Sequence, residues 1–226
     1  MRSGMDRVND ILLGPLERPA LAWMCRRMPA WVTPDQLTVL GIAGGVLTLS
    51  GFWLTRVHEG FLWLASAGLV VNWLGDSLDG NLARYRKIER PKYGYFVDHI
   101  ADALVTSLIC VGLGLSAYVR MSYALGALVT YLMLSILTYV TSQVTGVFRL
   151  SYGRFGPTEV RLVIILGCAV CLVTPNPVVR LGPLELRAFE LVTLVVIVLL
   201  ALSFLADAIR TARSLAALEP RRRRTP

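Results

Sequence analysis

Four aspartates lie inside stretches of this chain that are otherwise apolar enough for a lipid bilayer. An ionised carboxylate in such a place is costly unless it has a strong partner. In a helix, Asp76 and Asp79 are three residues apart and Asp98 and Asp102 are four apart, so each pair shares one helix face. If the two faces meet, four carboxylates converge on one point, and such oxygen donors suit Mg²⁺ or Mn²⁺. The sequence therefore predicts a divalent-cation site between two helices.

These aspartates belong to a longer pattern, D-x-x-D-G-x-x-A-R followed by G-x-x-x-D-x-x-x-D, which runs from Asp76 to Asp102. The pattern closely resembles the signature of the CDP-alcohol phosphotransferases (CDP-alcohol phosphatidyltransferases). These are integral membrane enzymes that exchange CMP for an alcohol in phospholipid synthesis. The chain departs from the signature at one point, because nine residues separate Arg84 from Gly94 where the family usually has eight. The extra residue falls in a polar loop, where an insertion is tolerated.

The resemblance implies a role for each aspartate. Asp76, Asp79 and Asp98 are expected to be metal ligands, for two Mg²⁺ or Mn²⁺ ions. Asp102 is expected either to complete the second metal site or to take the proton from the attacking hydroxyl as the catalytic base. Two metal ions would hold the pyrophosphate and stabilise the CMP that leaves.

The resemblance also implies a nucleotide site beside the acids. Gly80 has no side chain, so a nucleotide can approach the backbone closely there, and Ala83 is also small. Arg84 can pair with a phosphate through its planar guanidinium group. Gly94 is expected to keep the entrance of the third span open.

Two further residues are alternative catalytic bases. Phe96-Val-Asp98-His99 resembles a Phe-Asp-His string of the choline and ethanolamine phosphotransferases, and Thr158-Glu159-Val160 resembles a segment that enters their fifth membrane helix. The resemblance makes His99 and Glu159 candidates for the base that deprotonates diacylglycerol. The alternative interpretation is structural, with His99 a neighbour of Asp98 and Thr158 a helix cap.

A cluster of arginines follows the predicted fourth span. In relatives whose acceptor is itself a phosphate ester, a basic pocket binds that phosphate, so Arg149, Arg154 and Arg161 are acceptor-binding candidates. The same arginines could instead only mark the cytoplasmic face of the protein.

Composition independently favours a membrane protein. Hydrophobic residues make up 55% of the chain, charged residues make up 17%, and the mean hydropathy is +0.59. We predict six apolar spans, each near the ~20 residues that cross a bilayer, at 36–55, 61–83, 94–117, 121–147, 159–178 and 187–209. The expected fold class is an all-α integral membrane protein with six transmembrane helices, preceded by a cytoplasmic interfacial helix.

The basic residues predict the orientation of these spans. Of the 23 lysines and arginines, only Arg56, Arg120, Arg180 and Arg187 fall in the segments assigned to the outer side. The positive-inside rule then places both termini in the cytoplasm, with the aspartates near the cytoplasmic ends of the second and third spans. We therefore expect a multi-pass protein of the cell inner (cytoplasmic) membrane.

Three segments are expected along the chain: a cytoplasmic interfacial segment at 1–32, the six-helix membrane domain at 33–212, and a basic cytoplasmic tail at 213–226. Thr33 and Pro34 fit the N-cap and the first position of a helix. The arginines of the tail fix topology and attract anionic lipid head groups, and no nucleic-acid partner is expected. The resemblance implies a homodimer in the lipid bilayer.

The expected function is metal-dependent transfer of a phosphatidyl or phospho-alcohol group from a CDP-alcohol donor to an acceptor alcohol, with release of CMP. The first expectation is a CDP-diacylglycerol donor and a small polar alcohol acceptor. One alternative is an enzyme of the choline and ethanolamine type, with diacylglycerol as the acceptor. An alternative of another class is a divalent-cation transporter, which discontinuous helices or an inverted repeat would favour.

Overall fold

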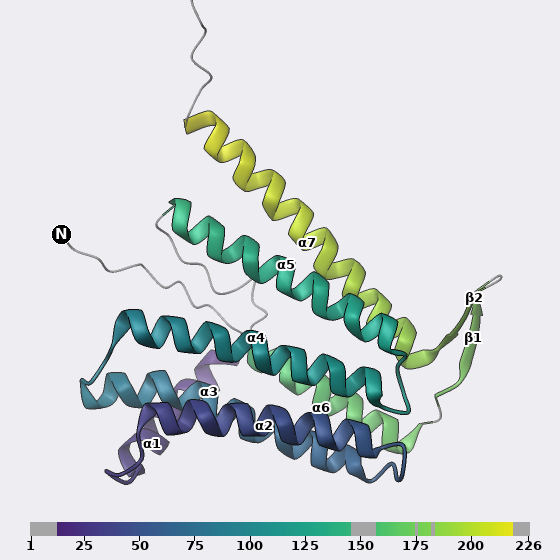
Figure 1. Cartoon of the computed structure of the whole chain (residues 1–226), viewed down its shortest axis with the longest axis horizontal. Helices are drawn as coiled ribbons and strands as arrows, with labels where there is room; N and C mark the ends of the chain where they lie inside the picture. The colour runs from purple at the N-terminus through teal and green to yellow at the C-terminus, as the bar shows by residue number, and fades with distance from the viewer. Residues whose placement is uncertain (1–12, 146–156, 175, 182–183, 219–226) are drawn as a thin grey trace, which may run out of the picture.

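The computed structural model describes residues 13–145, 157–174, 176–181 and 184–218. The elements, in chain order, are α1 (Gly14–Arg27), α2 (Pro34–Leu54), α3 (Phe61–Arg86), α4 (Pro91–Leu115), α5 (Met121–Thr145), α6 (Pro157–Val173), β1 (Val178–Leu181), β2 (Leu184–Arg187) and α7 (Ala188–Leu218). Figure 1 shows the axes of α2, α3, α4 and α6 roughly aligned, with α5 and α7 side by side at an angle to them.

Helix α2 begins where the sequence predicts a helix start. The Thr33 hydroxyl accepts a hydrogen bond from the Gln36 backbone N–H, and the Gln36 side chain accepts one from the Thr33 N–H. Pro34 stands at the first helical position, where its missing N–H costs nothing. This reciprocal cap fixes the start of the helix that packs directly against the acids of α3.

Helices α2 and α3 approach each other closely through small residues. A Cβ atom on Gly44 would lie 2.4 Å from the Asn72 nitrogen, and one on Gly75 would lie 2.4 Å from the Gly41 nitrogen. Only glycine fits at these two points, so the small residues of α2 and α3 form a packing surface between the two helices. The close register fixes how α3 presents Asp76 and Asp79 toward α2 and α4.

The chain is an all-α membrane protein, as predicted. Within the described residues, α2, α3, α4, α5 and α7 are long and apolar enough to cross a bilayer. Helix α6 has 17 residues, which corresponds to about 25 Å, somewhat less than the ~30 Å of a hydrocarbon core. The count of six spans and the interfacial position of α1 therefore stay predictions.

The predicted C-terminal ends of the last two spans differ from the ends of the corresponding helices. The span predicted at 159–178 ends early, because α6 stops at Val173 and the antiparallel hairpin of β1 and β2 follows. Pro177 lacks the N–H that a helix needs, and the β-branched pair Val178 and Val179 favours an extended chain. The last helix runs to Leu218 rather than ending at 209.

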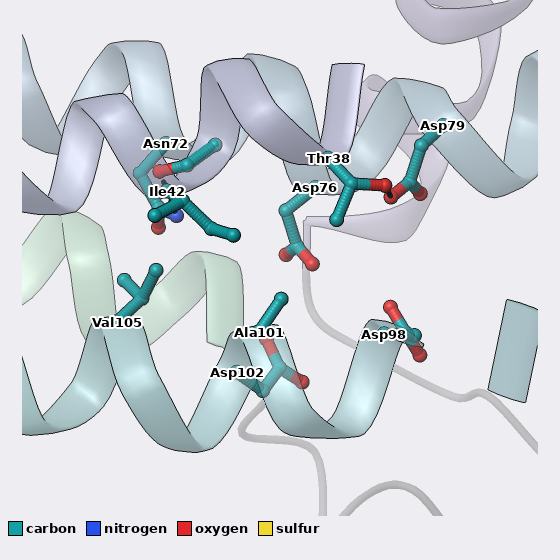
Figure 2. Close-up of a pocket in the computed structure, with 10 residues that line it drawn as sticks. Thr38, Ile42, Asn72, Asp76, Asp79, Asp98, Ala101, Asp102 and Val105 are labelled. Atoms are coloured by element: carbon teal, nitrogen blue, oxygen red, sulfur yellow. Dashed lines mark hydrogen bonds between the residues drawn. The ribbon is translucent and has the colours of Figure 1, made fainter. Parts of the chain in front are cut away.

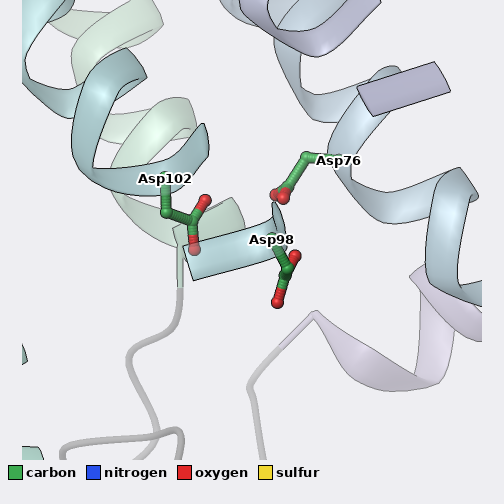
Figure 3. A group of neighbouring side chains, drawn as sticks. All are labelled: Asp76, Asp98 and Asp102. Carbon is green, nitrogen blue, oxygen red and sulfur yellow. The ribbon is translucent and has the colours of Figure 1, made fainter. Parts of the chain in front are cut away.

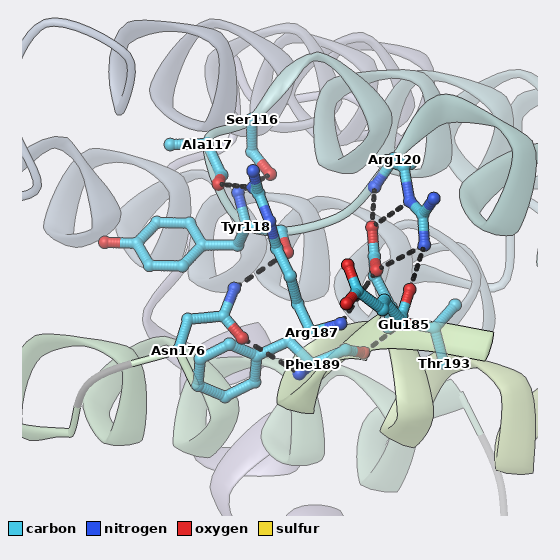
Figure 4. A network of polar contacts seen from close by, with 10 residues as sticks. Ser116, Ala117, Tyr118, Arg120, Asn176, Glu185, Arg187, Phe189 and Thr193 are labelled. Atoms are coloured by element: carbon cyan, nitrogen blue, oxygen red, sulfur yellow. Dashed lines mark hydrogen bonds and ion pairs between the residues drawn. The ribbon is translucent and has the colours of Figure 1, made fainter. Parts of the chain in front are cut away.

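A buried glutamate joins the hairpin to the loop between α4 and α5. Glu190, which is fully buried, accepts hydrogen bonds from the backbone N–H and the guanidinium of Arg120 and from the Arg187 N–H. Asn176 donates to the Tyr118 carbonyl and accepts from the Phe189 N–H (Figure 4). These contacts lie at the end of α4 that is remote from Asp98, and they secure the fold there.

Candidate active site

Helices α3 and α4 bring three acids together. One carboxylate oxygen from each of Asp76, Asp98 and Asp102 lies within 4.8 Å of the other two (Figure 3). Side chains three and four residues apart share a helix face, which is why Asp98 and Asp102 both point from α4 toward α3. A group of carboxylate oxygens is the donor set of a hard divalent cation, so these residues fit Mg²⁺ or Mn²⁺.

The fourth aspartate lines the same cavity but has a different partner. Asp79 is 9% exposed, and its Oδ2 accepts a hydrogen bond from the Thr38 hydroxyl of α2 over 2.6 Å. Figure 2 shows Thr38 and Asp79 at one end of the cavity that the other three acids also line. The bond holds one oxygen of Asp79 toward α2. Sequence reasoning missed Thr38 as a site residue, since its signal was only a hydroxyl one turn after Pro34, the first residue of the helix.

Arg161 of α6 contacts the acid cluster directly. Its Nη2 donates to Asp76 Oδ2 over 2.8 Å, and its Nε donates to the Asn72 side-chain oxygen over 2.8 Å. Asn72 in turn donates to the Gly41 carbonyl. Arg161 is 9% exposed, so this guanidinium, predicted to bind an acceptor phosphate, is in this structure a partner of Asp76. The other two acceptor-binding candidates, Arg149 and Arg154, lie outside the described residues.

The residues predicted to bind the nucleotide lie in the last turns of α3 and at the start of α4. A Cβ atom on Gly80 would come nearest to the Arg84 guanidinium, at 3.5 Å. Arg84 is exposed and donates to the Asn81 side-chain oxygen over 3.2 Å. Ala83 is partly buried, and a Cβ atom on Gly94 would meet nothing within 4 Å. Space therefore remains next to the acids, with a movable cation at its edge.

The structure separates the two alternative bases. His99 lies beside the acids, with Nδ1 at 3.4 Å from Asp98 Oδ2 and its ring between those of Tyr95 and Tyr139, at centroid distances of 4.0 and 4.8 Å. Glu159 is 5% exposed and accepts a hydrogen bond from the Leu13 N–H at the start of α1, over 3.0 Å. His99 is therefore placed close to the cluster, whereas Glu159 helps to hold α1 against α6.

Comparison with known families assigns the chain to one of them. Residues 31–216 match the family model of the CDP-alcohol phosphatidyltransferases. The match covers most of the chain and includes all four aspartates, so the chain belongs to this family.

Curated relatives include cholinephosphotransferase 1 from several vertebrates. The chain is 29% identical to the Danio rerio protein over 154 residues, which are 64% of this chain and 39% of that protein. It is 31% identical to the Homo sapiens protein over 112 residues, 47% of this chain and 27% of that protein. The match to the Gallus gallus protein is 25% over 193 residues, 80% of this chain and 57% of that protein. The chain thus spans between about a quarter and three fifths of these relatives.

Among solved structures, the fold is similar to that of phosphatidylinositol phosphate synthase from Mycobacterium tuberculosis, crystallised with CDP-DAG bound. The TM-score is 0.53 at 22% identity, covering 89% of this chain and 94% of that one. At this identity the likeness concerns the fold alone.

Proposed function

We propose that the protein transfers a phosphatidyl or phospho-alcohol group from a CDP-alcohol to an acceptor alcohol and releases CMP. The observation that carries the proposal is the convergence of Asp76, Asp98 and Asp102 from two apolar helices in a member of this family. Carboxylates inside apolar helices are functional by default because their burial costs stability. Here they are grouped as a cation site requires.

The proposed chemistry follows from where these residues lie. The acceptor oxygen attacks the phosphorus of the donor phosphate that carries the alcohol, the bond from that phosphorus to the bridging oxygen breaks, and CMP leaves with the electron pair. The proton of the acceptor goes to a carboxylate, which we assign to Asp102. When bound, Mg²⁺ or Mn²⁺ supplies charge neutralisation of the pyrophosphate. Asp76, Asp79 and Asp98 are proposed to hold two such ions, and Asp102 to complete the second metal site if another group takes the proton.

Two assignments of donor and acceptor remain distinct proposals. The first is CDP-diacylglycerol with a small polar alcohol, which the CDP-DAG bound to the structurally similar synthase supports. The second is a CDP-linked small alcohol with diacylglycerol as the acceptor, which the match to cholinephosphotransferases supports. We place the first ahead, because the four aspartates complete the family signature whereas Glu159, one of two candidate bases of the second, is held by the Leu13 N–H.

The test is CMP release by the purified protein with CDP-diacylglycerol, CDP-choline or CDP-ethanolamine, each against a panel of alcohols that includes diacylglycerol, glycerol 3-phosphate and inositol phosphate. Mass spectrometry of the lipid product identifies the acceptor. The expected result is CMP release that requires Mg²⁺ or Mn²⁺ and stops with EDTA. Metal uptake into sealed vesicles without CMP release from any donor would instead indicate a transporter.

A nucleotide beside Gly80 is the basis of a further prediction. Changing Gly80→Leu should abolish binding of a CDP ligand, because the added side chain would fill the space between the acids and Arg84. Gly80→Ala should be milder, since the nearest atoms to its Cβ belong to the flexible Arg84 side chain, at 3.5 Å. Arg84→Lys should weaken binding, because a point charge replaces a planar group with two donors. Titration calorimetry with CDP-choline and CDP-diacylglycerol measures all three. Unchanged affinity in Gly80→Leu would place the nucleotide elsewhere.

The proposed setting is the cell inner membrane, with both termini in the cytoplasm and the protein as a homodimer. The segments at 1–32, 33–212 and 213–226 keep their proposed roles as interfacial segment, membrane domain and basic tail. Helix α1 supports the first of these, because it carries exposed Leu16 and Trp23 together with exposed Arg26 and Arg27. Such a mixed surface suits the boundary between lipid and water.

A further inference from the structure

Helix α1 has one acidic side chain, Glu17, and it accepts hydrogen bonds from two other helices. Glu17 Oε1 accepts hydrogen bonds from Trp73 Nε1 over 2.9 Å and from the Ser77 hydroxyl over 3.1 Å, both on α3. The same carboxylate accepts the Thr158 hydroxyl of α6, at 3.2 and 3.3 Å to its two oxygens. Glu17 is thus the meeting point of α1, α3 and α6.

The residues that Glu17 contacts are immediate neighbours of the acid site. Ser77 follows Asp76 in the chain, and Trp73 lies three residues before Asp76, so Glu17 contacts α3 next to this proposed ligand. On α6, Arg161 lies three residues after Thr158, which places both on one helix face. Thr158 contacts Glu17, and Arg161 contacts Asp76. Three hydrogen bonds, from Ser77 to Glu17, from Thr158 to Glu17 and from Arg161 to Asp76, therefore form a closed circuit together with the backbones of α3 and α6.

We propose that Glu17 is a positioning residue for the metal ligand Asp76, acting through the placement of Arg161. This inference rests on the proposed function, because it takes Asp76 as a ligand. The Arg161 guanidinium holds Asp76 Oδ2, and the direction of that contact depends on where the first turn of α6 lies against α3. Glu17 fixes this turn by bridging Ser77 and Thr158. Outer partners that orient ligating carboxylates commonly change metal affinity about 10–100-fold when they are removed.

The charges of α1 support a specific role for the Glu17 contact. Its other charged residues, Arg18, Arg26 and Arg27, are basic and exposed, whereas Glu17 is partly buried. A carboxylate turned inward from a basic helix loses solvation, and the Trp73, Ser77 and Thr158 donors replace that lost hydration. A contact needed only for packing would not require a charge there. The arrangement links the docking of α1 to the geometry of the acids.

The test measures Mn²⁺ binding to the purified protein by electron paramagnetic resonance, together with the Mn²⁺ dependence of CMP release. Glu17→Ala should raise the Mn²⁺ concentration for half-saturation about 10-fold in both measurements, and most of the turnover should return at saturating Mn²⁺. Thr158→Val removes only the hydroxyl that joins α6 to Glu17 and should give a smaller shift in the same direction. This second variant decides the matter if Glu17→Ala fails to fold.

Glu89→Gln is the matched control, because it removes a carboxylate from the exposed loop between α3 and α4 without touching the circuit. An Mn²⁺ dependence in both Glu17→Ala and Thr158→Val equal to that of Glu89→Gln would overturn the inference. So would a loss of turnover that excess Mn²⁺ does not restore, since that pattern reports a packing defect. Asp76→Asn tests the ligand role of Asp76 separately from the positioning role of Glu17. If Asp76→Asn binds Mn²⁺ like the wild type in the same assay, the assignment of Asp76 as a ligand fails.

Discussion

Changing Asp98→Asn is expected to lower CMP release by about 10³-fold or more while the protein stays folded in the membrane. An amide has nearly the size of a carboxylate, so packing is kept, but the charge that would bind a cation is lost. Stabilisation of transition-state charge by a bound metal is worth several kcal/mol, and each ~1.4 kcal/mol corresponds to a factor of ten in rate. The same loss is expected for Asp76→Asn and Asp79→Asn, measured with the donor that gives the wild type its highest rate.

A suitable control is Asp207→Asn on α7, which also neutralises one aspartate but whose ion pair is with Arg210, three residues along its own helix. This variant should keep wild-type turnover and should show the same size-exclusion profile in detergent as the site variants. If Asp76→Asn, Asp79→Asn or Asp98→Asn kept near-normal turnover, that residue would not be a ligand.

The pairing of the acids within each helix could be predicted because it follows from short-range helical geometry. Asp76 with Asp79, and Asp98 with Asp102, are spaced so that a helix of either segment must place each pair on one face. Helical spacing did not specify that the two faces meet, and the family resemblance supplied that. The structure brings Asp76, Asp98 and Asp102 together and leaves Asp79 with Thr38.

What the sequence could not provide are contacts between distant segments. Arg161 pairs with Asp76 across 85 positions, and Thr158 bonds to Glu17 across 141. No periodicity relates such residues, because the packing of whole helices decides which side chains meet. In the sequence, Arg161 was equally compatible with binding a phosphate and with marking the cytoplasmic face. Its burial beside Asp76 results from the packing of α6 against α3.

The β hairpin is a second feature that the sequence could not predict. The run from 159 to 178 is apolar enough to be taken as one span, and its end depends on Pro177 and on the antiparallel pairing of Val178–Leu181 with Leu184–Arg187. Pairing between strands is a tertiary contact, so composition alone could not place the end of the helix.

The second large expected effect is the loss of turnover when the catalytic base is replaced. Asp102→Asn should eliminate turnover at every pH tested, including at saturating metal, because it removes the carboxylate that we assign as the base, and the neighbouring Asp76 and Asp98 are proposed metal ligands. Glu159→Gln should stay close to wild type, since a side-chain amide oxygen can still accept the Leu13 N–H. Loss of a positioned base commonly costs about 10²–10⁴-fold in rate.

His99 needs a pair of variants, because its ring is also packed between two tyrosines. His99→Phe keeps an aromatic ring between Tyr95 and Tyr139 but removes both nitrogens, whereas His99→Ala removes the ring as well. If His99 only packs, His99→Phe should keep most of the activity and His99→Ala should lose more. If His99 is the base, both variants should fall by about 10²–10⁴-fold.

The outcome also separates the two proposed substrate classes. An Asp102 base goes with the first proposal, a CDP-diacylglycerol donor, and a His99 base goes with the choline and ethanolamine type, in which diacylglycerol is the acceptor. Assays at saturating Mn²⁺ remove any contribution of Asp102 to metal affinity, so a residual defect reports proton transfer. Full activity of Asp102→Asn under that condition, with equal losses in His99→Phe and His99→Ala, would reverse the assignment and make diacylglycerol the expected acceptor.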